Sequence, residues 1–164
     1  MGLMGAGKST VGGALALRLD CPHLDNDHLL LANAGATAAA LAVKAGAEEL
    51  HAQESAQLRR MVSMPAPFVA GIAASAADRP DDLALLRAAG TVVYLRVSAS
   101  VLAARLGPGE GRPWLNGDAE AVLQRMFEQR DAAFQSCADL VIDCDVADAQ
   151  SVARDIAAAL VAAG

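Results

Sequence analysis

The stretch Gly2-Leu-Met-Gly-Ala-Gly-Lys-Ser-Thr10 decides the fold of this sequence. It matches the pattern G-x-x-x-x-G-K-[ST] in full, which is typical of a loop that holds nucleoside triphosphate phosphates. Glycines let the backbone curl so that successive N–H groups point at the phosphates. We expect Lys8 to reach the β- and γ-phosphates and the Ser9 hydroxyl to ligate Mg²⁺. The motif predicts a bound nucleoside triphosphate and leaves the reaction open.

The sequence behind this loop alternates between helical and strand patterns. Apolar residues recur at a spacing of four in residues 8–19, and the β-branched run TVVYLRV at 91–97 is the clearest strand. Further strands are expected at 22–25, 68–70 and 139–143, and further helices at 27–33, 47–62, 81–89, 98–106, 118–137 and 148–163. Short apolar strands between helices predict a parallel α/β sheet covered on both faces.

A phosphate-binding loop normally follows a strand that aims it, but only Met1 precedes Gly2. We therefore expect an open reading frame that starts upstream and supplies the central strand of the sheet. A chain without this strand would leave two ladders of backbone groups unpaired and would be poorly stable.

Length and charge limit the classes of function. The 164 residues predict a single domain over positions 1–164. The net charge of −6 excludes a basic footprint for nucleic acid over the whole domain. An anionic ligand must therefore be held by local positive groups.

The cysteines and the apolar runs bear on the compartment. Cys21, Cys137 and Cys144 show neither C-x-x-C nor Cys/His metal spacing, so free thiols in a reducing cytoplasm are expected. No stretch reaches the roughly 18 apolar residues of a membrane span. The first residues do not have the pattern of a signal peptide.

Two carboxylates follow the first expected strand. Asp25 and Asp27 lie 17 and 19 residues after Lys8, where a strand of such a sheet ends beside the phosphates. One carboxylate can support Mg²⁺, and the other can orient an attacking hydroxyl or accept its proton. The alternative is that Asp25 or Asn26 only caps the next helix.

Residues 107–117 are rich in Gly and Pro and contain Arg112-Pro113, which predicts a lid loop. A closing lid would exclude water and place the Arg112 charge on the transferring group. The alternative is a solvated surface loop. Arg105 either stacks on adenine or lies on the surface of its helix.

Taken together, these residues resemble the shikimate kinase family over nearly the whole chain. The resemblance rests on GLMGAGKST, Asp25/Asp27, a G-x-E-x-x-x-x-x-E pattern at Gly46, Glu48 and Glu54, Arg105, Arg112-Pro113 and Arg130. It implies a three-layer P-loop NTPase fold of the nucleoside-monophosphate-kinase type with a five-stranded parallel sheet. It also implies an acceptor-binding region at about 26–62 and a lid at about 107–117.

The resemblance further implies Mg-ATP-dependent phosphorylation of the shikimate 3-hydroxyl, a step of aromatic amino acid biosynthesis. Asp27 would bind the acceptor and act as base, Asp25 would support the metal beside Ser9, and Arg130 would bind the acceptor carboxylate. Lys8, Asp27 and Arg112 form the implied catalytic set. The implied ATP-binding set is Gly5, Ala6, Gly7, Lys8, Ser9, Thr10, Arg105 and Arg112.

The acceptor half departs from the family pattern. His51 stands where the family has an arginine for the shikimate carboxylate, and Ile72, Ala73 and Ala74 replace a glycine triad. We expect Ile72 to intrude on the acceptor ring, with Ala73 as the contact at this turn. Phe134 replaces the tyrosine of R-x-P-x-Y. An arginine–carboxylate contact in a closed site is worth about 2–4 kcal/mol, or about 30- to 1,000-fold in binding.

Three functions remain open on the sequence. The first is a shikimate kinase with a weakened acceptor site. The second is a kinase of another hydroxyl compound such as a sugar acid, because Ala73-Ala-Ser-Ala76 is faintly similar to the gluconate kinase turn. The third is an ATP-binding protein that has lost catalysis. We expect ATP, Mg²⁺ and a small-molecule acceptor as ligands of a cytoplasmic monomer, with neither nucleic acid nor membrane as partner.

Overall fold

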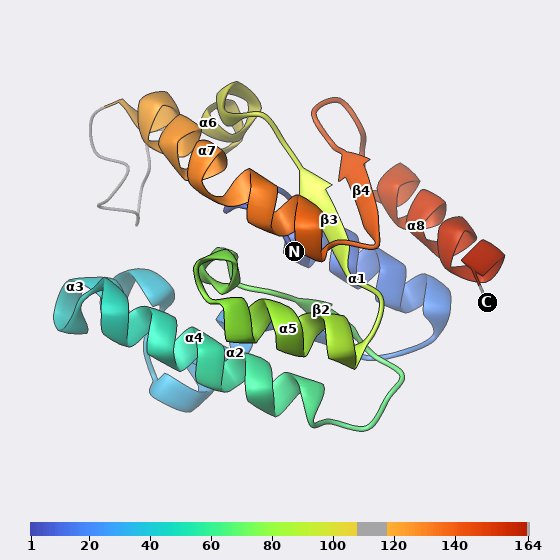
Figure 1. The fold of residues 1–164 in the computed structure, drawn as a ribbon, viewed down its shortest axis with the longest axis horizontal. Helices are drawn as coiled ribbons and strands as arrows, with labels where there is room; N and C mark the ends of the chain where they lie inside the picture. Colours follow the sequence, from blue (N-terminus) through green and yellow to red (C-terminus); the bar gives the residue numbers. More distant parts are fainter. Residues whose placement is uncertain (108–117, 164) are drawn as a thin grey trace.

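The computed structural model describes residues 1–107 and 118–163. Short parallel strands lie between helices, with α7, α5 and α4 nearer the viewer in Figure 1 and α1 behind. The helices are α1 Lys8–Leu19, α2 Asn26–Ala34, α3 Ala38–Ala45, α4 Ala47–Val62, α5 Pro80–Ala89, α6 Ala99–Leu106, α7 Ala119–Cys137 and α8 Ala149–Ala163, with the 3-10 helix η1 Ala74–Asp78. The strands are β1 His23–Asp25, β2 Val69–Gly71, β3 Val93–Arg96 and β4 Leu140–Asp143.

The strands form two parallel pairs. β1 pairs with β2 in the register Leu24 to Ala70, and β3 pairs with β4 in the register Tyr94 to Val141. The expected five-stranded sheet is therefore not confirmed, because the described residues form two separate two-stranded sheets. Parallel strands, helices on both sides and the element order agree with the sequence prediction.

The start of the chain lies along the edge of β3 that faces away from β4 (Figure 1). The Met1 ammonium donates to the Val93 carbonyl at 2.6 Å, and the Leu95 N–H donates to the Met1 carbonyl at 2.9 Å. A Cβ on Gly2 would lie 2.6 Å from the Leu95 carbonyl oxygen, which leaves no room for a side chain. This single residue continues the ladder of β3 and leads directly into the phosphate-binding loop.

The core is mostly aliphatic and lies between the helices and the strands. Its largest fully buried side chains include Tyr94, Phe134, Met61, Leu102 and Leu123. The rings of Tyr94 and Phe134 stack with their centroids 5.0 Å apart. Since the helices are rich in alanine, their backbones can approach the strands closely with few aromatic residues to fill the core.

Several helix ends follow from local side chains. Asp118 accepts from the Ala121 N–H at the start of α7, and Asp148 accepts from the Gln150 and Ser151 N–H groups at the start of α8. Ser98 occupies the expected capping position before α6, but its side chain makes no capping hydrogen bond. The alanine-rich segment after α2 forms a separate helix, α3. Gly35 ends α2, and the Thr37 side chain caps the start of α3.

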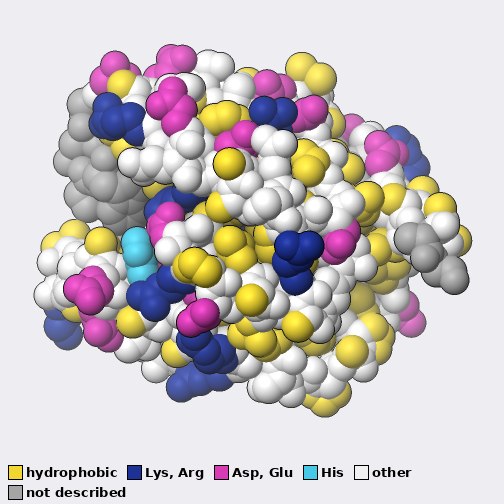
Figure 2. All heavy atoms as spheres, in the orientation of Figure 1, with side chains coloured by type: hydrophobic (Ala, Val, Ile, Leu, Met, Phe, Trp, Pro, Cys, Tyr) yellow, Lys and Arg dark blue, Asp and Glu magenta, His cyan; other side chains and the backbone are white. Residues whose placement is uncertain are grey.

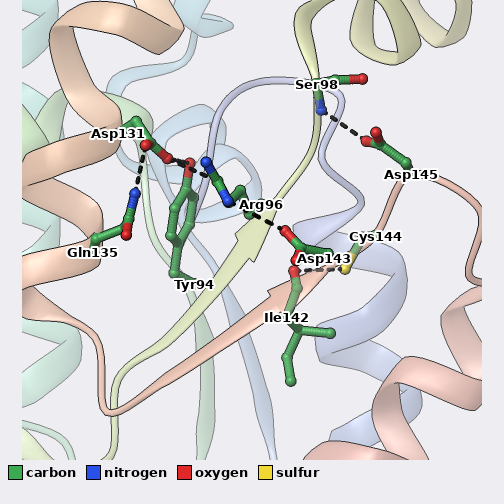
Figure 3. A network of polar contacts seen from close by, with 9 residues as sticks. All are labelled: Tyr94, Arg96, Ser98, Asp131, Gln135, Ile142, Asp143, Cys144 and Asp145. Carbon is green, nitrogen blue, oxygen red and sulfur yellow. Dashed lines mark hydrogen bonds and ion pairs between the residues drawn. The ribbon is translucent and has the colours of Figure 1, made fainter.

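A polar network fixes α7 against the second sheet (Figure 3). Asp131 of α7 accepts from the Tyr94 hydroxyl at 2.9 Å and from Arg96 Nε at 3.2 Å, both on β3. Gln135 donates to the same carboxylate, and Arg96 lies 3.7 Å from Asp143 of β4. Burial and the bond to Asp131 raise the pKa of Tyr94, so this phenol stays a donor. The network holds α7 in place, and Arg130, the residue before Asp131 on this helix, lines the cavity described below.

None of the helices in the described part of the chain is long and apolar enough by itself to cross a membrane. The pair formed by α2 and α3, bent by 54° at its junction, meets these limits only when both helices are counted together.

Candidate active site

One open cavity of about 900 Å³ lies where the phosphate-binding loop meets the ends of β1 and β2. Helices α2, α3 and α4 supply its second wall, and α6 and α7 reach it from the side of the second sheet. The cavity brings together most of the site residues predicted from the sequence: Gly5, Gly7, Lys8, Ser9, Thr10, Asp25, Asp27, His51, Ala73, Arg105 and Arg130. Residues as far apart in the sequence as Gly5 and Arg130 thus share one space. Ala6 is the exception among the described members, because it is buried beneath the loop.

The phosphate-binding loop ends in the first turn of α1. Gly7 is the residue before this helix, with φ 90° and ψ 18°, a conformation that favours glycine over residues with a side chain. No side chain caps the helix, so the first-turn N–H groups of Lys8, Ser9 and Thr10 stay available to an anion. The geometry suits a phosphate group at the helix end.

Lys8 connects the loop to its acidic surroundings. Its ammonium donates to the carbonyls of Gly2 and Leu3, each at 3.0 Å. Burial lowers the pKa of Lys8, while the carboxylates of Asp27, Asp25 and Glu54 act in the opposite direction. A phosphate group could replace the loop carbonyls as the partner of this ammonium.

The position of Asp25 allows both functions that the sequence left as alternatives, support of a metal ion and capping of a helix. Its Oδ1 accepts from the N–H groups of Asp27 and His28 at 3.0 and 3.2 Å, so it caps α2. Burial raises its pKa, but the Ser9 hydroxyl and these two N–H groups outweigh burial and lower the pKa of Asp25 overall. The ionised carboxylate therefore lies beside Ser9. Asp27 is exposed in the cavity wall.

Glu54 of α4 is a buried carboxylate in the cavity wall. The Ser75 hydroxyl donates to its Oε2. Burial raises the pKa of Glu54, and Ser75, Arg130 and Lys8 partly offset this effect. Glu54 thus links α4 to the turn after β2, which holds the acceptor side of the cavity in place.

Behind this wall, α4 makes a second buried contact. Ser55 donates to Asp82 Oδ1 at 2.7 Å, and Arg59 lies 3.4 Å from the same oxygen. Asp82 is 2% exposed, so these two partners supply the polar contacts of its carboxylate Oδ1 away from water. The contact joins α4 to α5 beneath the site.

The residues that depart from the family pattern line the acceptor side. His51 is half-buried, and burial lowers its pKa, with Asp78 opposing and Arg130 and Arg79 adding to the effect. A neutral imidazole therefore stands at this position near pH 7. Ile72 is 6% exposed and belongs to the apolar core, and it also lines the cavity beside Ala73, so its intrusion on the acceptor ring stays a prediction.

Arg130 is held by a carboxylate that the sequence prediction did not include. Its Nε donates to Asp78 Oδ1 at 2.9 Å and its Nη2 to Asp78 Oδ2 at 2.5 Å. The Arg130 side chain is 11% exposed. Asp78 ends η1 and lies 52 residues before its partner, so no local pattern signals the pair. Glu54, in contrast, was visible as the last member of the G-x-E-x-x-x-x-x-E pattern.

The remaining basic residues of the prediction lie on the nucleotide side or outside the described residues. Arg105 donates to the carbonyls of Cys144 and Asp145 at 2.6 and 3.4 Å, which ties the end of α6 to the segment after β4. Arg112 and the expected lid beyond Gly107 lie outside the described residues.

Figure 2 shows how the positive side chains are distributed over one face of the molecule. Lys and Arg side chains alternate with Asp and Glu side chains over the described part of this face, without an extended region of one sign. An anionic ligand would thus be bound by individual groups of the cavity, as the net charge of −6 predicts.

Comparisons with known proteins agree on one family. The family model described as shikimate kinase matches residues 4–161. The chain is 36% identical over 157 residues to a shikimate kinase of Chromohalobacter salexigens, covering 95% of this chain and 87% of that protein. It is 38% identical over 147 residues to a shikimate kinase of Burkholderia pseudomallei, covering 87% and 78%.

The fold matches solved structures of the same kind. Shikimate kinase from Acinetobacter baumannii in complex with shikimate superposes with a TM-score of 0.93 at 28% identity, over 98% of this chain and 90% of that one. Shikimate kinase from Bacteroides thetaiotaomicron gives a TM-score of 0.85 at 25% identity, over 98% and 95%. The phosphate-binding loop, the carboxylates beside it and these matches together show that the chain is a phosphotransferase that belongs to the shikimate kinase family.

Proposed function

We propose that this chain transfers the γ-phosphoryl group of ATP to the 3-hydroxyl of shikimate. The observation that carries the proposal is the single cavity in which the loop around Lys8, the carboxylate of Asp27 and the guanidinium of Arg130 meet. A phosphoryl donor and a hydroxyl acceptor must meet in one space for direct transfer. The shikimate bound to the Acinetobacter relative supports the choice of acceptor.

The nucleotide side uses the loop and two arginines. The backbone N–H groups at Gly5–Thr10 hold the β- and γ-phosphates, and Lys8 exchanges its bonds to the Gly2 and Leu3 carbonyls for phosphate oxygens. In this proposal Arg105 contacts the adenine ring, and Arg112, which lies outside the described residues, neutralises the transferring phosphoryl group. Each of these groups places positive charge where negative charge develops.

Magnesium fits the donor set at the loop. The Ser9 hydroxyl lies beside the Asp25 carboxylate, and oxygen donors with few protein ligands suit Mg²⁺ bound to a nucleotide. The described residues contain no cluster of three or more His, Cys, Asp or Glu side chains able to hold a metal without a nucleotide. Bound Mg²⁺ would offset phosphate charge there.

The chemistry needs one proton acceptor. The acceptor hydroxyl oxygen forms a bond to the γ-phosphorus while the bond to the β,γ-bridging oxygen breaks and ADP leaves. Asp27 orients the hydroxyl and takes its proton, which it then releases to solvent from its exposed position. The lowered pKa of Asp25 keeps that neighbour ionised, so Asp27 is the carboxylate left free for this transfer.

The acceptor is held by Arg130, His51 and Ala73, within an acceptor-binding region of about 26–62 and the wall formed by the turn after β2. His51 contributes a neutral hydrogen-bonding group instead of a charge. We propose one domain over residues 1–164, with a lid at about 107–117, that acts as a cytoplasmic monomer. The three cysteines are free thiols in the structure.

The residues at the acceptor side also favour a second candidate acceptor, a hydroxyl compound without a carboxylate. Because His51 replaces an arginine and Asp78 occupies Arg130, a hydroxyl compound without a carboxylate would lose less at this site than shikimate does.

The test is a coupled assay of ADP release with Mg-ATP and millimolar shikimate. Quinate, gluconate and a panel of uncharged polyols run beside it, with a blank that lacks acceptor. Release that depends on shikimate supports the proposal. Release only with another acceptor, or none above the blank despite measurable ATP binding, contradicts it.

A further inference from the structure

Asp78 meets Arg130 edge to edge. Both carboxylate oxygens accept, one from Nε and one from Nη2, at 2.9 and 2.5 Å. This is the two-bond geometry in which a guanidinium binds a carboxylate most strongly. Asp78 therefore uses the same kind of contact that a carboxylate of a ligand would use.

The contact lies at the cavity and not on a remote surface. Arg130 lines the cavity, and its side chain is 11% exposed, while the Asp78 side chain is 37% exposed. The guanidinium is thus shielded from water, whereas the carboxylate that holds it can move out into solvent. An ion pair with one buried member is screened less than a pair on the surface.

Arg130 is the one Lys or Arg side chain that lines the acceptor side in the described part of the cavity. The other Lys and Arg side chains that line the described part of the cavity are Lys8 and Arg105, which lie on the nucleotide side and bond to backbone carbonyls. His51 is close enough to Asp78 and Arg130 for both to affect its pKa, but burial keeps it neutral. In the described part of the cavity, an acceptor carboxylate thus finds its positively charged partner in Arg130, which Asp78 already holds.

We infer that Asp78 is a specificity-determining residue of the acceptor site, which competes with an acceptor carboxylate for the guanidinium of Arg130. The inference rests on the proposed function, in which Arg130 holds that carboxylate. An acceptor with a carboxylate must displace Asp78 or share Arg130 with it, whereas an uncharged acceptor does neither. Asp78 therefore reduces the preference of the site for acceptors with a carboxylate over uncharged acceptors.

The test is calorimetric binding of shikimate and of its uncharged methyl ester to the wild type and to Asp78→Asn. The substitution keeps the shape of the side chain and removes its charge, so shikimate should bind about 3- to 10-fold more tightly. Binding of the methyl ester should change little. Asp78→Ala is a second variant that should show the same gain.

Two further variants separate competition from other effects. Asp81→Asn removes a nearby exposed carboxylate that does not line the cavity, and it should leave shikimate binding unchanged. In an Arg130→Ala background, Asp78→Asn should give no gain, because the guanidinium for which it competes is gone.

The outcomes are distinct. Tighter binding of shikimate but not of the ester, lost in the Arg130→Ala background, supports the inference. Unchanged or weaker shikimate binding in Asp78→Asn overturns it, and weaker binding would show that Asp78 positions Arg130 instead. Phosphoryl transfer to shikimate is measured separately for every variant. If shikimate binds more tightly to Asp78→Asn but no variant phosphorylates it, the proposed function is refuted while the competition between Asp78 and the acceptor carboxylate is still supported.

Discussion

Replacing His51 by arginine should restore a charge that the acceptor side lacks. His51 lines the cavity and is half-buried, and its lowered pKa makes it neutral near pH 7. A hydrogen bond between an arginine and a ligand carboxylate contributes about 1.5–3 kcal/mol. Arg130 and Arg79 would repel a second cation, while Asp78 would attract it and partly neutralise it.

These opposing effects place the net gain near the lower limit of that range. We take about 1.4 kcal/mol, which corresponds to a fall of about tenfold in the KM for shikimate. The KM for ATP should not change, because the nucleotide loop lies on the other side of the cavity. The coupled ADP-release assay at saturating Mg-ATP measures both constants.

His51→Gln is the matched control. It exchanges one neutral polar side chain for another, so the KM for shikimate should change by no more than about twofold. If His51→Arg left this KM unchanged or raised it while kcat stayed normal, position 51 would not face the acceptor carboxylate. An equal fall in KM for the uncharged methyl ester would refute the electrostatic reason.

Four other predictions follow from the site and its supports. Lys8→Ala should abolish ATP turnover without loss of the thermal unfolding transition, because the ammonium that meets the phosphates is lost; full activity would refute the assignment of the loop. Asp27→Asn should lower kcat by about 100-fold or more with little change in ATP affinity, and an unchanged kcat would show that Asp27 is no base. Glu54→Gln should flatten the pH dependence of the free energy of unfolding. Because the pKa of Glu54 is raised in the folded state, the stability linked to its protonation is fully present below pH 4.5 and is lost as the pH rises through the folded pKa. Urea unfolding at several pH values measures this loss in the wild type and its absence in the variant. Ser55→Ala should lower the free energy of unfolding by about 1–3 kcal/mol, since it removes the 2.7 Å donor to buried Asp82, and a midpoint like that of the wild type would show that Arg59 alone suffices.

The sequence by itself was sufficient for the parts that depend on local rules. The loop pattern, the four-residue spacing in α1 and the β-branched run in β3 predicted their elements within about two residues. The carboxylates of Asp25 and Asp27, at and after the end of β1, were predicted to reach the phosphates because parallel strands end at one edge, and the cavity does contain both of them. Such features follow from neighbours in the chain.

The tertiary structure decided what depends on contacts between distant residues. The two separate strand pairs, the core position of Ile72 and the double use of Asp25 as cap and neighbour of Ser9 required coordinates. The pair of Asp78 with Arg130 joins side chains 52 residues apart, and neither residue type indicates its partner. Local propensity acts through the backbone of a few residues, whereas ion pairing and burial are set by which elements pack together. For this chain, the sequence therefore predicted the residues of the nucleotide side, whereas only the folded structure showed that Asp78 pairs with Arg130 on the acceptor side.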